Sequence, residues 1–407
     1  MACLALLVVA ALVPGLGWTS TNAISFQAPG ALHVGLQASH ASQPSGARAL
    51  LVHAVATTPR VFSHPPIGRA GIIDPNLSYG AEPAPMGVTD FGLTPNWTGY
   101  AYATPVFQAN ATIGSLTASS TGAAGTALGF QLNAEDVVTG GGRTYVYWIQ
   151  DVAFYDTNTR QMQWEDNVWN LSASGGGGLF SNSVAGNGTV YSSTYYAAVA
   201  SGYPGSPVTL SLPTTILARI VASNASGTPH VGIEYNDGQG WVIFDNVTFP
   251  FLTNGVNHGF LVTGFQYNPS GTYLDAEWDV CGPGGGLTQK LGSSSLDMGL
   301  SYWNGHNFQA VRSAFDFGAN TGESMSNVVD HFGGTNSTGA VYGHLVNGTG
   351  SLGPLYGSAD VATLRISTGS QSSGAIVLNG VVVPYIGALA NLTLAPGGYQ
   401  IVLTANG

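Results

Sequence analysis

Three acidic residues occupy alternate positions in one short stretch of the sequence, Tyr273–Val280. Leu274, Ala276, Trp278 and Val280 alternate there with Asp275, Glu277 and Asp279. In an extended strand, alternate side chains point to the same face and lie about 7 Å apart, so the three carboxyls would share one face. Like charges this close raise one another's pKa values, so one carboxyl can keep its proton beside an ionised neighbour. General acid–base catalysis requires such a pair, although a calcium site or a solvated strand face would use the same residues.

A second polar position interrupts the most hydrophobic strand candidate, Tyr145–Phe154. Gln150 would share a face with Trp148, and Asp151 would share the other face with Tyr147. Both faces are largely apolar, so whichever polar residue points inward needs a hydrogen-bond partner. Gln150 and Asp151 are therefore both candidates for a site.

The stretch Gln163–Asn170 is a third candidate. It places Trp164 directly beside Glu165 and Asp166. Aromatic side chains next to amides and acids are typical of clefts that bind an extended peptide or a sugar, and they also occur on ordinary exposed sheets.

Several familiar active-site patterns are absent from the sequence. It has no Asp-Thr/Ser-Gly triplet, no Gly-x-Ser-x-Gly elbow and no His-Glu-x-x-His motif. Cys281, the only cysteine besides Cys3, is expected to be a small buried residue. Gly282–Gly286 lacks the Lys-Ser/Thr of a phosphate-binding loop and is expected to be a turn. Carboxylates and amides are the chemistry that remains.

The composition is poor in charge. Only nine of the 407 residues are Lys or Arg and twenty are Asp or Glu, so charged residues make up 7% of the chain, against roughly 25% in ordinary soluble proteins. Nucleic-acid binding is excluded because no basic surface is available to neutralise phosphates. With all carboxylates and histidines protonated, the chain would carry only 18 positive charges. Such a chain is suited to acid because its self-repulsion changes little with pH; the alternative is a glycine- and serine-rich secreted β protein without a special pH.

The elements that must position these residues are expected to be strands. Short runs of Val, Ile, Tyr, Phe, Trp and Thr alternate with polar residues and are separated by Gly, Asn and Ser. Clear examples are Thr144–Phe154, Gln161–Leu171, Val208–Leu217, Gly240–Phe249, Gly259–Tyr267 and Thr272–Val280. No segment keeps a 3.6-residue apolar period over twelve residues. The sequence therefore predicts an all-β fold, an antiparallel β-sandwich or jelly roll.

Four segments are expected along the chain. Residues 1–23 have the layout of a secretory signal peptide without its positive start, and residues 24–83 form a leader or pro-segment that holds three of the nine basic residues. Residues 84–355 form the main β-sandwich. Residues 356–407 form a small C-terminal β domain in which Asn379-Gly380 marks a hairpin turn.

An extracellular location is expected. Ten Asn-x-Ser/Thr acceptors fit a secreted, glycosylated chain: Asn76, Asn96, Asn110, Asn170, Asn187, Asn224, Asn246, Asn336, Asn347 and Asn391. No segment besides the signal approaches the length of a membrane span. A monomer is expected, and with no second cysteine in the mature chain its stability must come from packing.

Several stretches together resemble the thermopsin family of acid peptidases. They are Pro85–Gly92, Tyr147–Phe154, Glu165–Asn170, Tyr273–Val280 with Gly282–Gly285, Tyr302–Gly305, and Phe317–Gly318 with Thr321–Ser324 and Asn327–Val328. Their order and spacing agree over roughly residues 84–355. The resemblance implies a secreted endopeptidase that works in hot acid on polypeptide substrates and is made with a signal and a pro-segment.

Ala276-Glu277-Trp278 also resembles a strand of the eqolisin glutamic peptidases. That family uses a glutamine and a glutamate on a concanavalin-like β-sandwich, and its glutamine lies on an earlier strand, as Gln150 does here. The resemblance implies a Gln150/Glu277 pair. This sequence departs from the pattern because Asp275 and Asp279 flank the glutamate. The rival is a carboxylate pair drawn from Asp151, Glu165, Asp166, Asp275 and Glu277.

The resulting hypothesis is hydrolysis of a peptide bond by activated water. Glu277 would be the general base and Gln150 would donate to the oxyanion. Asp275 or Asp279 would raise the pKa of Glu277 by proximity. Trp148, Trp164, Glu165 and Asp279 are the expected substrate contacts, and no metal or organic cofactor is required. The alternatives are a carbohydrate-binding or glycosidase-like sandwich and a non-catalytic surface-layer or adhesion protein.

Overall fold

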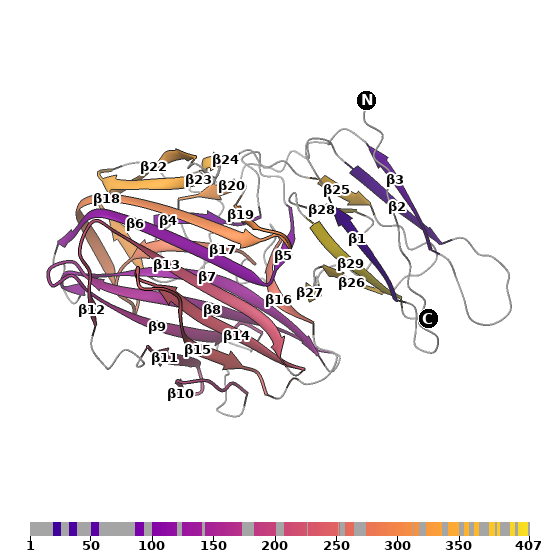
Figure 1. Ribbon diagram of the computed structural model, residues 1–407, viewed down its shortest axis with the longest axis horizontal. Coiled ribbons are helices and arrows are strands. Elements are labelled where there is room, and N and C mark those ends of the chain that lie inside the picture. Colours follow the sequence, from indigo (N-terminus) through magenta and orange to yellow (C-terminus); the bar gives the residue numbers. More distant parts are fainter. Residues whose placement is uncertain are drawn as a thin grey trace.

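The structure of the protein is a computed structural model. It describes residues 19–25, 32–38, 50–56, 86–92, 100–119, 124–140, 143–172, 183–200, 207–225, 227–250, 252, 257–263, 274–311, 313–316, 323–335, 341–349, 354–357, 362–365, 374–378, 381–382, 391–394 and 398–405. Its elements are strands (Figure 1). In this part of the chain, no helix has the length and hydropathy needed to cross a bilayer.

The first large sheet carries most of the candidate residues. Its strands are β4 (Met86–Asp90), β5 (Tyr102–Thr104), β7 (Ala127–Gly140), β8 (Arg143–Asp156), β9 (Gln161–Asn170), β10 (Thr189–Tyr191), β11 (Tyr195–Val199), β12 (Val208–Thr209), β16 (Asn257–Val262), β17 (Ala276–Cys281), β20 (Ser313–Phe315) and β24 (Pro354–Gly357). The order along the sheet is β10-β11-β9-β8-β7-β17-β4-β20-β24, with β12 paired to β9 and β16 paired to both β5 and β7.

The second large sheet lies against the first. Its strands are β6 (Val106–Ser119), β13 (Thr214–Ala225), β14 (Thr228–Asn236), β15 (Val242–Thr248), β18 (Thr288–Trp303), β19 (Phe308–Ala310), β21 (Ser324–Ser326), β22 (Val328–Thr335) and β23 (Val341–Asn347). The order is β15-β14-β13-β6-β18-β23-β22, and β19 and β21 pair with β18. Pairings are antiparallel except that of β18 with β21.

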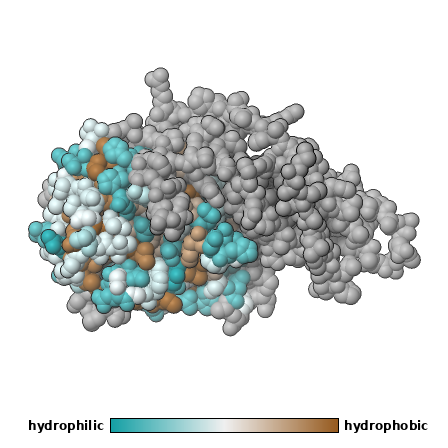
Figure 2. All heavy atoms as spheres, turned by 45° about the horizontal axis from the view of Figure 1, so that its top comes forward, coloured by the Kyte–Doolittle hydropathy of each residue, from teal (hydrophilic) through white to brown (hydrophobic). Residues whose placement is uncertain are grey.

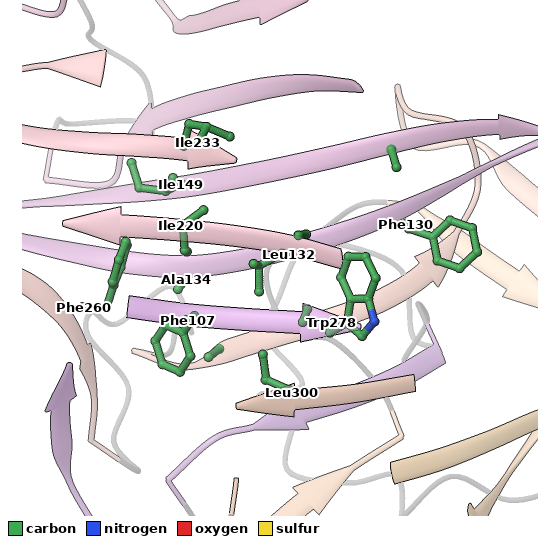
Figure 3. Close-up of a cluster of buried hydrophobic side chains, with 14 of the residues drawn as sticks. Phe107, Phe130, Leu132, Ala134, Ile149, Ile220, Ile233, Phe260, Trp278 and Leu300 are labelled. Carbon is green, nitrogen blue, oxygen red and sulfur yellow. The ribbon is translucent and has the colours of Figure 1, made fainter. Parts of the chain in front are cut away.

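The inner faces of the two sheets form one hydrophobic core (Figure 3). Trp278 of β17 crosses this core, and its indole Nε1–H donates to the backbone oxygen of Asn110 on β6 at 2.8 Å. Trp164 of β9 stacks on Tyr235 of β14 with ring centroids 4.8 Å apart. Because apolar residues alternate with polar ones along these strands, each sheet buries one face against the other. The prediction of an all-β antiparallel sandwich is confirmed.

Most expected strands agree with the structure to within a few residues where it describes them; residues 264–267 of Gly259–Tyr267 and 272–273 of Thr272–Val280 lie outside the described residues. Val208–Leu217 is the exception, since it is divided into β12 and the start of β13. Pro213 lies at the break, and proline has no N–H to donate to a strand ladder. A glycine also shapes the neighbourhood of the acidic stretch: a Cβ on Gly87 of β4 would lie 2.1 Å from the carbonyl oxygen of Trp278. Only glycine therefore lets β4 approach β17 this closely.

Three smaller sheets are formed by the two ends of the chain (Figure 1). They consist of β1 (Thr19–Ser25), β26 (Gly374–Leu378), β27 (Val381–Val382) and β29 (Gly398–Ala405); β2 (Leu32–Ala38) and β3 (Leu50–Ala56); and β25 (Ala362–Arg365) and β28 (Asn391–Leu394). Leu378 pairs with Val381, as a two-residue hairpin requires; the turn residues Asn379 and Gly380 lie outside the described residues. β1, which overlaps the end of the expected signal peptide, pairs with β29.

The surface is mixed in polarity. On the face shown in Figure 2, hydrophobic and hydrophilic residues alternate over the coloured part without one continuous apolar patch.

Candidate active site

Polar side chains from four neighbouring strands line up on the outer face of the first sheet. Thr89 of β4 pairs with Glu277 of β17, Glu277 with Asn133 of β7, and Asn133 with Gln150 of β8. Directly paired residues of antiparallel strands point to the same side of a sheet. These four residues, which we call the polar row, therefore share the face opposite to the hydrophobic core. The sequence predicted the strands of Glu277 and Gln150, and the register brings the two residues into one row.

Amide hydrogen bonds connect the members of the polar row. Asn133 donates from Nδ2 to Oε2 of Glu277 at 2.9 Å, and its Oδ1 accepts from Nε2 of Gln150 at 3.1 Å. Gln131, two residues earlier on β7, accepts from Gln150 at 3.2 Å and from Asn133 at 3.4 Å. Asn133 thus links the proposed base to the proposed amide donor.

Asp279 is a buried acidic neighbour of Glu277. Its pKa is raised well above the ordinary value, first by burial, then by the charge of Glu277 and by a hydrogen bond to the Glu277 carboxyl. The Thr89 hydroxyl, which donates to Oδ1 at 3.5 Å, opposes this shift weakly. A carboxyl that keeps its proton to a higher pH than usual therefore lies beside Glu277, a pairing that general acid–base chemistry can use.

A second carboxyl pair, Asp275 and Glu135, adjoins Glu277. Burial raises the pKa of both groups well above their ordinary values, and the charge of Glu277 adds to the shift in each. The backbone N–H of Asp275 donates to Oε2 of Glu135 at 2.8 Å, which favours the charged form of Glu135. Four acids therefore meet here, and they cannot all be ionised together.

The site is buried. Glu277, Asn133 and Thr89 have no exposed surface, and Gln150 is 6% exposed. A low dielectric environment strengthens the hydrogen bonds of the polar row and the repulsion among the carboxyls.

Asp151 lies on the opposite side of the first sheet from Gln150. It pairs with Leu132 and with Asp166, and all three side chains are buried on the inner face. Burial raises the pKa of Asp151 well above the ordinary value; the Arg219 backbone N–H opposes this shift and the charge of Glu234 adds to it. Asp151 is therefore not brought together with Glu277.

Asp166 is also on the inner face, where it meets Asp245 of the second sheet. Burial raises its pKa most, followed by the charge of Asp245 and a hydrogen bond to the Asp245 carboxyl. The Ala198 N–H donates to its Oδ1 at 2.7 Å and opposes the shift. Tyr196 donates to the same Asp245. These contacts join the two sheets inside the core.

The two predicted tryptophans are separated by the sheet. Trp164 is 3% exposed and stacks on Tyr235 between the sheets, so it does not face Glu277. Trp148 is on the outer face with Gln150, where it pairs with Trp169. Trp169 in turn stacks on Tyr195 with ring centroids 4.5 Å apart.

Tyr191 extends this line, and its ring centroid is 5.4 Å from that of Tyr195. Trp148, Trp169, Tyr195 and Tyr191, which we call the aromatic row, follow one register line from β8 to β10. Tyr191 is 48% exposed, so the outer end of the row is open to solvent. Glu165 is on the same face of β9, where burial raises its pKa and the amide of Asn167, donating at 3.3 Å, opposes the shift.

Sequence reasoning missed the residues of β7. This strand carries Gln131, Asn133 and Glu135, which alternate with Leu132 and Ala134. Gln131 and Asn133 belong to the amide network of the polar row, and Glu135 belongs to the acid cluster, which also contains Asp275, Glu277 and Asp279. This alternation over Phe130–Glu135 was a usable strand signal. The segment escaped notice because its polar residues are mostly amides.

Two predictions next to β17 are confirmed. Cys281 is a buried free cysteine. Residues 282–287 turn from β17 into β18, with positive φ angles at Gly284, Gly285 and Gly286. Among the described residues, no group of three or more His, Cys, Asp or Glu side chains could hold a metal ion.

Comparison with known proteins identifies the family. Residues 71–328 match the family model described as Thermopsin, so the match begins within the expected leader. The chain is 32% identical over 271 residues to thermopsin of Sulfolobus acidocaldarius, an alignment that covers 63% of this chain and 79% of that protein. The matched region contains the polar row, the acid cluster and the aromatic row. The chain belongs to the thermopsin family of peptidases.

Proposed function

We propose that this chain is a secreted endopeptidase adapted to hot acid, in which Glu277 and Gln150 cleave peptide bonds with an activated water. The observation that carries the proposal is the polar row. Glu277 and Gln150 lie on the two strands that flank β7, and both bond to Asn133. Their backbones are two strand spacings apart, about 10 Å, and the Asn133 side chain bridges the two.

In the proposed mechanism Glu277 is ionised and holds the attacking water. It removes one water proton as the oxygen attacks the peptide carbonyl, and the carbonyl oxygen becomes an oxyanion. One N–H of Gln150 turns from its present acceptor, Gln131 or Asn133, to that oxyanion. Glu277 then gives its proton to the amide nitrogen, the C–N bond breaks, and the carboxylate is restored.

The aromatic row is proposed to hold the polypeptide substrate. Trp148 and Trp169 are half-buried and share the face of Gln150, so a chain bound along them would lead to the polar row. Trp169 is proposed to make the substrate contact that was expected of Trp164, because Trp164 lies between the sheets. Glu165 and Asp279 remain candidates for contacts at the edge of the bound chain.

The chain is proposed to be a precursor. The buried state of Glu277 and Gln150 means that a substrate reaches them only after part of the chain has moved away. Release of a signal (residues 1–23) and a leader (residues 24–83) would also separate β1 from β29. N-terminal sequencing of secreted material, paired with its activity against pH, tests this step.

Two variants test the catalytic assignment in the secreted, active protein. Glu277→Gln removes the base with little change of shape, and we expect kcat to fall by about 10²–10⁴-fold. Gln150→Leu removes the oxyanion donor, and we expect a loss of about 10²–10³-fold. Hydrolysis of casein at acid pH is the assay, with circular dichroism and thermal unfolding to confirm folding.

Asp151→Asn is the matched control, because Asp151 is next to Gln150 but faces the inner side of the sheet. We expect it to keep near-normal activity. Full activity of Glu277→Gln would end the assignment. Loss of activity in Asp151→Asn alone would favour an aspartic pair. Membership of the family favours a peptidase over the carbohydrate-binding and adhesion alternatives. If the secreted protein hydrolyses no protein substrate at any pH, the result would instead support those alternatives.

A further inference from the structure

Asn133 is the residue through which Gln150 and Glu277 are connected. It is fully buried, it donates from Nδ2 to Glu277 Oε2 at 2.9 Å, and it accepts at Oδ1 from Gln150 at 3.1 Å. Its position in the middle strand lets it bond to a residue on each of the two neighbouring strands.

We propose that Asn133 is a positioning residue that keeps Glu277 ionised and oriented beside Gln150. This inference rests on the function proposed above. Asn133 is not assigned to the bound substrate; it acts through the two residues that it bonds.

The first argument concerns which acid in the cluster loses its proton. Asp275 and Asp279 face Glu277 from its own strand and Glu135 faces it from β7, while β4 contributes the uncharged Thr89. A hydrogen bond donated to a carboxylate favours the ionised form. Glu277 receives a short amide bond from Asn133, whereas Asp279 receives a long bond of 3.5 Å from Thr89. The shorter bond favours Glu277 as the ionised member of the pair.

The second argument concerns orientation. An amide that turned over would place its oxygen against the Glu277 carboxylate. The Asn133 amide is held against this rotation because its oxygen accepts from Gln150 and its nitrogen also donates to Gln131 at 3.4 Å. The three amides therefore fix the direction from which Glu277 is bonded, and buried networks of this kind are costly to disrupt.

Two variants of Asn133 test the inference. Asn133→Leu removes both bonds at similar volume, and Asn133→Asp keeps the shape but replaces the donor with a further acid. In both we expect kcat to fall about 10- to 100-fold with KM changed less than about twofold, because one hydrogen bond to a charged group is lost. We also expect the acid limb of the kcat/KM profile to move up by about one pH unit, because Glu277 is then harder to ionise. An internally quenched peptide that contains a cleavage site mapped in casein is the substrate.

Gln289→Leu is the matched control. Gln289 is a fully buried amide of the second sheet that donates to the backbone oxygen of Ala127 at 2.7 Å. Its loss should lower the thermal midpoint without moving the acid limb. If both Asn133 variants fold and show an unshifted acid limb, Asn133 has only a structural role and the inference is wrong.

The inference and the proposed function fail separately. An active Glu277→Gln variant overturns both. An inactive Glu277→Gln variant together with unshifted Asn133 profiles overturns only the role of Asn133. If Asn133→Leu does not fold, the isosteric Asn133→Asp variant decides the question alone.

Discussion

Gln150 and Glu277 bond to the same residue, Asn133, from opposite sides. Each lies one strand away from β7, so their backbones are about 10 Å apart and Asn133 links them across that distance. Glu277 and Asp279 have a different relationship, since they lie two residues apart on one strand and Glu277 helps to raise the pKa of Asp279. The proposed function uses the first pair as base and oxyanion donor, while the second pair could share a proton.

Replacement of Asp279 by asparagine distinguishes these two arrangements. The introduced side-chain amide can still donate to Glu277, so we expect kcat to stay within about tenfold of wild type if Asp279 only supports Glu277. If Asp279 supplies a proton to the leaving group, the loss should instead be about 10²–10⁴-fold. Measurement of kcat and KM for both Asp279→Asn and Glu277→Gln decides between a glutamic mechanism and a paired-carboxyl mechanism.

Truncation of Trp169 tests the aromatic row. Trp169 stacks on Tyr195 and pairs with Trp148 on the face of Gln150. We expect Trp169→Ala to raise KM about tenfold with a small effect on kcat, because contact area far from the reacting bond is lost. Trp241→Ala is the control: the Trp241 ring packs under Arg219, 3.9 Å from the guanidinium carbon, away from the aromatic row. Equal KM values for Trp169→Ala and wild type would contradict a binding role.

The buried pair Asp166 and Asp245 predicts how stability depends on pH. Burial and the neighbouring carboxyl raise the folded-state pKa of Asp166 well above its ordinary value of 3.8. The folded protein therefore binds more protons than the unfolded chain above about pH 4, and the free energy of unfolding falls as the pH rises through the folded-state pKa. Below the ordinary value this contribution is constant, so the pair favours stability in acid.

Asp166→Asn should remove part of this dependence. The asparagine keeps an oxygen for the Ala198 N–H and cannot ionise. We expect the variant to be more stable than wild type by roughly 1–3 kcal/mol at pH 7, the usual scale for one poorly compensated buried charge, and similar to wild type at pH 3. Urea unfolding at the two pH values measures the difference, and a variant that is less stable at pH 7 would rule out this explanation.

The local pattern of the sequence predicted the strand that carries the acids and the all-β class of the fold. The alternation in Tyr273–Val280 predicted that Asp275, Glu277 and Asp279 share a face; Glu277 and Asp279 are on the outer face of the first sheet, and Asp275, just before β17, adjoins them. The absence of helical periodicity predicted an all-β sandwich, which the two large sheets confirm. Alternation is a property of neighbouring residues, so it can be read without knowledge of the fold.

The partners of those strands could not be predicted in the same way. Trp164 and Trp169 belong to one expected cleft stretch, yet one stacks between the sheets and the other is on the outer face. Gln150 and Asp151 likewise point to opposite faces, and nothing within Tyr145–Phe154 shows which face is the core. A shift of one residue in register exchanges the two faces of a strand, and packing against the second sheet fixes that choice.

The sequence by itself determined the chemistry available to this protein: few charges, an acidic strand and a glutamine on an earlier strand. Only the tertiary structure decided that Asn133 stands between Gln150 and Glu277, and that Asp151 and Asp166 are inside the core. Asn133 and Glu277 are 144 residues apart in the chain. Contacts over such a separation depend on the register and packing of whole sheets, which no local pattern of residue types encodes.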